Sequence, residues 1–186
     1  IKDESILENI LNDFNTNFWI KHDEMMAKKF GFDKLQEGDD EIFTTAQQVM
    51  QDLEIDYTLF FKQLETYSDH IDFKIHFKEV FYSRTTEEQF EKLKEFLTLY
   101  QNRLAKNSIS KTDSSNLMKA TNPKFILRNY LLFECINELN EGKKDLLNKL
   151  LTALENPYKE IYPEFSVKRP NEYDGQTGCS TLSCSS

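Results

Sequence analysis

Glycine is scarce in this chain, whose 186 residues include only five, and the five are scattered. A loop that cradles phosphates needs clustered glycines, and neither G-x-G-x-x-G nor G-x-x-x-x-G-K-S/T occurs. The kinase motifs V-A-I-K, H-R-D and D-F-G are also missing. We therefore expect no nucleotide-binding site and no catalytic residue within these 186 residues.

Cysteine is equally scarce, and the three cysteines are too widely spaced to predict a disulfide framework, so a reducing compartment is the default. No apolar run approaches the length of a membrane span, and the N-terminus lacks a signal-peptide pattern. These features predict a protein that is neither secreted nor inserted in a membrane. The chain begins at Ile1 rather than Met, which suggests a fragment or a processed form of a longer protein.

Concentrated positive charge is also missing. The net charge is −9, and the lysines are interleaved with Glu and Asp as on solvated helix faces, which argues against nucleic-acid binding. The three histidines, His22, His70 and His76, lack metal-ligand spacing, and no C-x-x-C supports them. The acidic run 39–41 lacks a calcium-loop pattern and is better explained as the start of a helix. We expect no metal site.

Aromatic residues, by contrast, are abundant, with 15 Phe and eight Tyr, and proline is rare. Many rings and few helix breakers predict an all-α fold. Apolar residues at helical spacing predict helices over about 6–30, 42–53, 57–67, 90–104, 125–136 and 146–154. Asp56 is the expected N-cap of the third, and Thr85 or Thr86 begins a capping box for the fourth.

The segment from Ile71 to Phe77 is ambiguous. Ile71, Phe73, Ile75 and Phe77 alternate with polar residues, which is the period of a strand. Phe73 and Phe77 also fit a helix that continues to Phe81. A strand needs a partner, and no second candidate is present, so a helix is the favoured interpretation.

The predicted organisation is a helical domain over residues 1–156, followed by an extended strap and tail over 157–186 that is rich in Pro and Tyr. Residues 106–117 are polar and aperiodic and predict an internal linker. Asn122-Pro123 matches a helix start, with an N-cap residue followed by proline at the first helical position. The last residues are expected to form a flexible tail that contains Cys179 and Cys184.

Several short motifs follow one another in a recognisable order. They are Asp56-Tyr57-Thr58 with Phe61 and Leu64, Tyr100 with Arg103-Leu104, Met118, Asn122-Pro123, Leu127-Arg128-Asn129, Leu131, Ile136, Gly142, Pro157-Tyr158, Arg169-Pro170 and the terminal Cys184-Ser185-Ser186. In this order they resemble the selenoprotein O (YdiU-like) family, most strongly from Met118 onward. The chain departs from the family at 171–173, where Asn-Glu-Tyr replaces a frequent second Pro and Trp.

The resemblance implies a kinase-like pseudokinase enzyme that uses ATP and a divalent metal such as Mg²⁺ to transfer AMP to Ser, Thr or Tyr hydroxyls of proteins. In the family the kinase-like core precedes this region, so these residues would be its C-terminal helical support, with that core and the protein substrates as partners. The implied compartment is the bacterial cytoplasm or the mitochondrion. Cys184 occupies the position of the family's selenocysteine, and the resemblance implies that it forms a regulatory disulfide with a cysteine of the core.

Each of these residues also has a plainer interpretation. Cys184 could be an inert thiol on a free end, and Cys179 could be a bystander rather than a resolving thiol. Cys135 lies among apolar positions and is expected in the core. Arg128 and Asn129 are best explained by capping and pairing. The alternative for the whole chain is a non-enzymatic helical module whose aromatic faces bind a partner protein.

Overall fold

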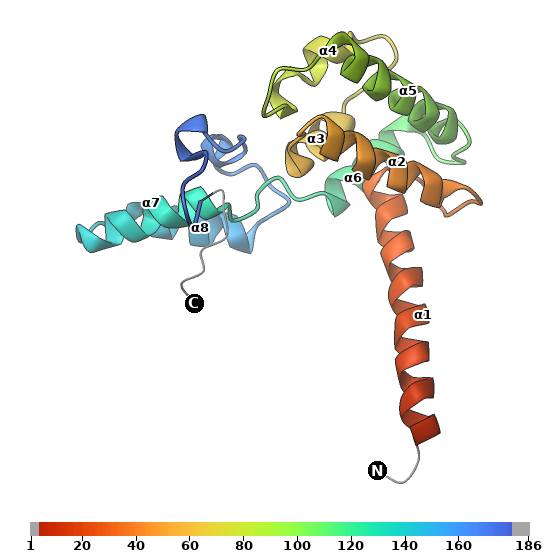
Figure 1. Cartoon of the computed structure of the whole chain (residues 1–186), viewed down its shortest axis with the longest axis horizontal. Helices are drawn as coiled ribbons and strands as arrows, with labels where there is room; N and C mark the ends of the chain where they lie inside the picture. Colours follow the sequence, from red (N-terminus) through yellow and green to blue (C-terminus); the bar gives the residue numbers. More distant parts are fainter. Residues whose placement is uncertain (1–3, 180–186) are drawn as a thin grey trace.

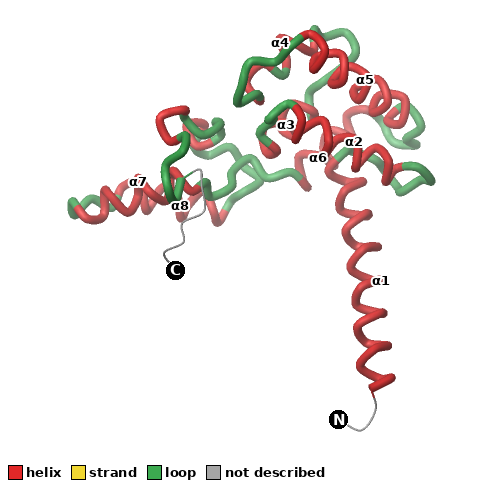
Figure 2. Tube along the Cα trace, in the orientation of Figure 1, coloured by secondary structure: helices red, strands yellow, loops and turns green. Residues whose placement is uncertain are grey.

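The fold is entirely helical over the part of the chain that the computed structural model describes, residues 4–179, where no strand is found (Figure 2). The helices are α1 (Glu4–Lys29), α2 (Asp39–Asp52), α3 (Tyr57–Leu64), α4 (Phe73–His76), η1 (Lys78–Val80), α5 (Glu87–Leu104), α6 (Lys111–Thr121), α7 (Asn129–Asn140), α8 (Asp145–Glu155), η2 (Pro163–Phe165) and η3 (Asn171–Tyr173). An isolated antiparallel bridge between Ile55 and Phe81 ties the segment before α3 to the residue after η1. The all-α prediction is confirmed.

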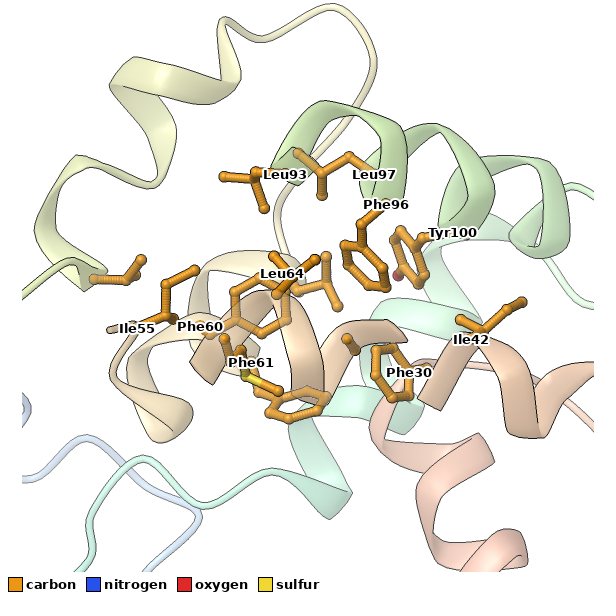
Figure 3. Packing of buried hydrophobic residues seen from close by; sticks show 14 of the residues in the cluster. Phe30, Ile42, Ile55, Phe60, Phe61, Leu64, Leu93, Phe96, Leu97 and Tyr100 are labelled. Atoms are coloured by element: carbon orange, nitrogen blue, oxygen red, sulfur yellow. The ribbon is translucent and has the colours of Figure 1, made fainter. Parts of the chain in front are cut away.

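An aromatic core holds together the first lobe, defined here as residues 26–121 (Figure 3). Phe30 lies at its centre, with ring centroids 5.0 Å from Phe61 in an edge arrangement and 5.3 Å from Phe43 in a stacked one. Phe96 and Tyr100 of α5 also lie against it, with ring centroids 6.4 and 6.1 Å from that of Phe30. Offset and edge-to-face geometries are the favourable ones for aromatic pairs, so the abundance of Phe in the sequence is explained by this core.

Local capping signals fix where the helices of the first lobe begin. The side chain of Asp56 accepts a hydrogen bond from the backbone N–H of Leu59 at 3.0 Å, which confirms the predicted N-cap of α3. Thr86 and Gln89 form a complete capping box at α5, also as predicted. The ambiguous segment 71–77 contains the short helix α4, capped by Asp72, so the helical interpretation is confirmed.

The close crossing of α1 and α6 depends on Gly31. Its φ is +74°, a left-handed conformation in which glycine avoids the strain of a side chain. Its carbonyl accepts hydrogen bonds from Ser114 Oγ at 2.6 Å and Asn107 Nδ2 at 2.7 Å. A Cβ at this position would lie 2.5 Å from Ser114 Oγ and 2.9 Å from Met118 Cγ, so the contact excludes any side chain.

Two predictions about the segment 106–123 are wrong. Residues 111–117, expected in a polar linker, form the first part of α6, which the side chain of Ser110 caps. Only Ser114 and Met118 of this helix are buried, so its sequence needs little apolar periodicity. Asn122-Pro123 does not begin a helix. Asn122 is the C-cap of α6, in the extended conformation that the following proline favours, and its side chain is bonded to Lys29. The next helix begins only at Asn129.

A second, smaller core defines the second lobe, residues 125–179, which lies to one side of the first (Figure 1). α7 packs against α8, and Tyr130, Leu150 and Phe165 are buried between them and the strap. The predicted strap thus contributes to this core through Phe165 and Cys179. A domain boundary at residue 156 stays a prediction.

Candidate functional site

An ion pair joins two of the family-like motifs at the junction between the lobes. Arg128, which precedes α7, donates from Nη1 to Asp56 Oδ2 at 2.6 Å and from Nη2 to Oδ1 at 2.9 Å. The hydroxyl of Tyr82 donates to the same carboxylate at 2.6 Å. Asp56 is only 4% exposed, so one buried carboxylate caps α3 and holds the second lobe by a two-point contact.

The electrostatics of the junction favour the charged carboxylate. Burial raises the pKa of Asp56, but the hydrogen bonds from Arg128, Tyr82 and the Leu59 N–H more than offset this, so its pKa lies below the usual value. The pKa of Tyr82 is raised, first by burial and then by the Asp56 carboxylate. These groups therefore form a stable structural network at neutral pH rather than a proton-transfer pair.

Further contacts strengthen the junction from the strap. Lys168 Nζ donates to the carbonyl of Phe81 at 2.6 Å, and the guanidinium of Arg169 lies 5.2 Å from the centre of the Tyr82 ring. Lys124 forms a buried ion pair with Glu65 of the first lobe. The lobes are thus joined both through Lys124 and Arg128 and through the strap.

Beside this junction lies a buried lysine. Lys29, the last residue of α1, is 7% exposed, and its ammonium donates to Asn122 Oδ1 at 2.8 Å. Nζ also lies 4.4 Å from the centre of the Phe61 ring and 5.1 Å from that of Tyr57, in cation–π geometry. A cavity of about 150 Å³ opens here, lined by Lys29, Tyr57, Thr58, Phe61, Asn122, Pro123 and Ile126, and is called the Lys29 pocket below.

No carboxylate within the described chain is bonded to Lys29. Glu65 acts on it only from a distance, because its carboxylate is engaged by Lys124. Burial accordingly lowers the pKa of Lys29 to about 8, and the distant charge of Glu65 only partly opposes this. The pocket therefore holds a cation without an anion, a costly arrangement that a bound carboxylate would relieve.

A second unusual feature is the exposed apolar face of α1. The end of this helix enters the core of the first lobe through Met26 and Ala27, with Phe30 directly after it. The remainder projects away from it (Figure 1). Its exposed apolar side chains are Ile6, Leu7, Ile10, Leu11, Phe14, Phe18, Trp19, Ile20 and Met25. Such a face on a projecting helix indicates an interaction surface.

The cysteines lie apart from these features. Cys135 is buried in the second lobe, which confirms its predicted core position. Cys179 is a free, buried thiol in the same core, packed rather than presented to solvent. Cys184 lies outside the described residues, so its role stays a prediction.

The other expectations concern metals and membranes. Among the residues that the structure describes, no three His, Cys, Asp or Glu side chains come together as metal ligands, and no helix is long and apolar enough to cross a membrane.

Asn129 is the first residue of α7 rather than its cap. Arg128 takes the cap position, without a side-chain capping bond.

Sequence reasoning missed the roles of Lys29 and Tyr82. Lys28-Lys29 reads as ordinary basic residues at a helix C-terminus. The position of Lys29 next to the apolar residues Met26, Ala27 and Phe30 was the one available signal that Lys29 would be buried. Tyr82 carried no signal, because its partner lies 26 residues away.

Comparison with known proteins gives consistent matches. A family profile described as "Protein adenylyltransferase SelO" matches residues 1–155. The chain is similar to proteins named "Protein nucleotidyltransferase YdiU". It is 35% identical to the one from Cytophaga hutchinsonii over 95% of this chain and 35% of that protein, and 32% identical to the one from Flavobacterium johnsoniae over 97% and 36%. The Rhodopirellula baltica protein is 34% identical over 87% and 33%. The chain thus spans about a third of the length of these curated relatives.

Proposed function

This chain belongs to the SelO family of protein adenylyltransferases, and from that membership we propose that it is the C-terminal helical region of an enzyme that transfers AMP from ATP to Ser, Thr or Tyr hydroxyls of proteins. The observation that carries the proposal is the match of the family profile to residues 1–155. Relatives about three times as long, named as protein nucleotidyltransferases, support it.

The role of these residues is to support the nucleotide-binding core rather than to form it. The glycine-rich and kinase-type motifs that would hold ATP are missing from the sequence. Among the described residues no three His, Cys, Asp or Glu side chains come together as metal ligands, and no residue here is assigned to ATP or Mg²⁺. ATP and the metal are proposed to bind a kinase-like core in the rest of the longer protein, with substrate proteins docking there.

Nucleotide binding provides a direct test. Isothermal titration calorimetry with ATP and Mg²⁺ should give saturable binding to the full-length protein and no measurable heat of binding to residues 1–186 alone. Micromolar affinity of the 186-residue chain for ATP would overturn the assignment of the nucleotide site to another segment. Circular dichroism of the 186-residue chain, with the expected strong helical signal, is the control for folding.

A regulatory role for Cys184 is part of the same proposal, which places the protein in the bacterial cytoplasm or the mitochondrion. Its support is the terminal Cys184-Ser185-Ser186 and the free state of Cys135 and Cys179. Cys184 is proposed to pair with a cysteine of the core, with Cys179 as a candidate resolving thiol that would first have to leave its buried position.

Mass analysis of the oxidised full-length protein under non-reducing conditions tests this regulation. A disulfide that contains Cys184 should be found, and it should disappear in Cys184→Ser. It should persist in Cys135→Ala, because that thiol is buried in the second lobe. A protein without this disulfide, or one in which the bond survives Cys184→Ser, would contradict the redox role.

A further inference from the structure

We propose that the apolar face of α1 and the Lys29 pocket form one continuous docking surface for a segment of the longer protein outside these 186 residues. That segment presents apolar side chains to α1 and a carboxylate to Lys29. The inference rests on the part of the proposed function that places this chain within a protein about three times its length. It does not depend on the reaction which that protein catalyses.

The exposed residues of α1 form a stripe rather than a random scatter. At about 100° per residue, seven of the nine exposed apolar residues of α1 fall within an arc of about 140°: Ile6, Leu7, Ile10, Leu11, Phe14, Phe18 and Met25. Trp19 and Ile20 lie outside this arc. The residues by which α1 enters the first lobe, Met26, Ala27 and Phe30, are centred on roughly the opposite side of the helix. The stripe is therefore a separate contact face, which the first lobe leaves uncovered.

The stripe leads directly to the Lys29 pocket. Met25 and Lys29 are one helical turn apart and lie within the same arc, so the buried ammonium continues the line of apolar side chains. Beyond Lys29 the surface continues through Tyr57 and Ile126, which are exposed and line the pocket. A helix or extended segment lying on the stripe would thus place one side chain at the mouth of the pocket.

The charges at this end of the surface select an acidic side chain. Lys29 is bonded to one amide oxygen and faces two aromatic rings, which leaves its positive charge without a carboxylate among the described residues. Lys28 is exposed in the same arc, and Lys21 in that arc is paired with Glu24. A carboxylate within hydrogen-bonding distance of Lys29 in this apolar setting would gain a charge-assisted hydrogen bond.

The same charges argue against a second copy of this chain as the occupant. A copy that laid its own stripe on this one in the parallel sense would bring Lys21, Lys28 and Lys29 of both copies close together. It would offer no free carboxylate from the described arc, because Glu24 is paired with Lys21. The net charge of −9 on each copy adds to the repulsion. In a protein as long as the relatives, about two thirds of the residues lie outside this chain, and a segment of them can provide both apolar and acidic groups.

Site-specific photo-cross-linking in the full-length protein tests the proposal. A photo-reactive benzoylphenylalanine replaces Phe14, which is 68% exposed, or Ile10 as a second site on the stripe. The matched control replaces Ile75 of α4, which is 66% exposed and lies outside the stripe. We expect position 14 to give an intramolecular cross-link to a peptide outside these 186 residues, and position 75 to give none.

Two results would overturn this expectation. Cross-links from both stripe positions to a second copy would assign the surface to a dimer, and no cross-link from either position would show that the stripe faces solvent. If the stripe gives the expected intramolecular cross-link, the cross-linked segment should carry an Asp or Glu. Lys29→Met should then reduce the cross-link yield, whereas Lys94→Met, a change in an exposed i,i+3 pair, should not. An unchanged yield in Lys29→Met would refute the carboxylate contact.

The outcome is separable from that of the proposed function. Intramolecular cross-links in a protein that transfers no AMP would support the docking surface and refute the enzymatic assignment. Transfer of AMP by a protein whose stripe gives no cross-link would support the enzymatic assignment and refute the docking surface.

Discussion

Removing the charge of Asp56 should uncouple the two lobes. In Asp56→Asn the amide can still accept from the Leu59 N–H and cap α3, so the N-cap is largely retained. The guanidinium of Arg128, however, loses its anionic partner in a setting where its side chain is only 12% exposed. Breaking a buried ion pair from one side costs about 3–5 kcal/mol, and we expect a loss near 3 kcal/mol in the free energy of unfolding.

A matched control separates this effect from the loss of any Arg–Asp pair. Asp174 accepts from Arg169 at 2.6 and 3.2 Å, and its side chain is largely exposed. Asp174→Asn should therefore cost about 1 kcal/mol or less. Denaturant unfolding measures both changes, and hydrogen exchange over 124–140 should show that Asp56→Asn specifically loosens the attachment of the second lobe.

The pH dependence of the cost of Asp56→Asn tests the direction of the Asp56 pKa shift. Because the pKa of Asp56 is lowered in the folded chain, its contribution is complete above about pH 4, the usual pKa of Asp, and is lost as the pH falls through the lower folded value. The difference between the wild type and Asp56→Asn should thus shrink in acid. Equal costs for Asp56→Asn and Asp174→Asn at neutral pH would refute the view that the buried pair holds the lobes together.

Two further predictions concern α1 and its end. Since the pKa of Lys29 is lowered to about 8, the unfolded chain binds more protons between that pH and about 10.4, so stability should rise with pH across this window. Denaturant unfolding of Lys29→Met should lack this rise, and a rise of equal size would contradict the burial of the ammonium. Gly31→Ala should destabilise the chain by more than 2 kcal/mol, because it adds a clash with Ser114 to the backbone strain. Gly175→Ala, where φ is also positive but no atom lies within 4 Å of the new Cβ, should cost only about 1 kcal/mol, and equal melting shifts in the two variants would refute the close contact.

Local features of the fold could be predicted, because their causes lie within a few residues. The Asp56 cap and the Thr86–Gln89 box were both correct, and each depends on neighbours within one turn. Helix α6 was missed because its sequence lacks a periodic apolar face. Its burial is limited to Ser114 and Met118, so the only sequence signal was the cap at Ser110.

The candidate sites could be predicted only in part. The motifs around Asp56 and Arg128 were visible, but their pairing joins residues 72 positions apart, which no periodicity or capping rule encodes. The apolar pattern of α1 predicted a helix correctly. The pattern alone could not show that most of the stripe stays exposed in this chain, because an apolar face is the same in sequence whether its cover lies within the chain or outside it.

The central claim is that these residues support a protein adenylyltransferase. Its most direct test is AMP transfer from ATP labelled at the α-phosphate, measured for the full-length protein and for the same protein without residues 1–186. We expect label to enter protein hydroxyls with the full-length protein and transfer to be lost when the helical region is removed. No incorporation by the full-length protein, or full incorporation without these residues, would contradict it.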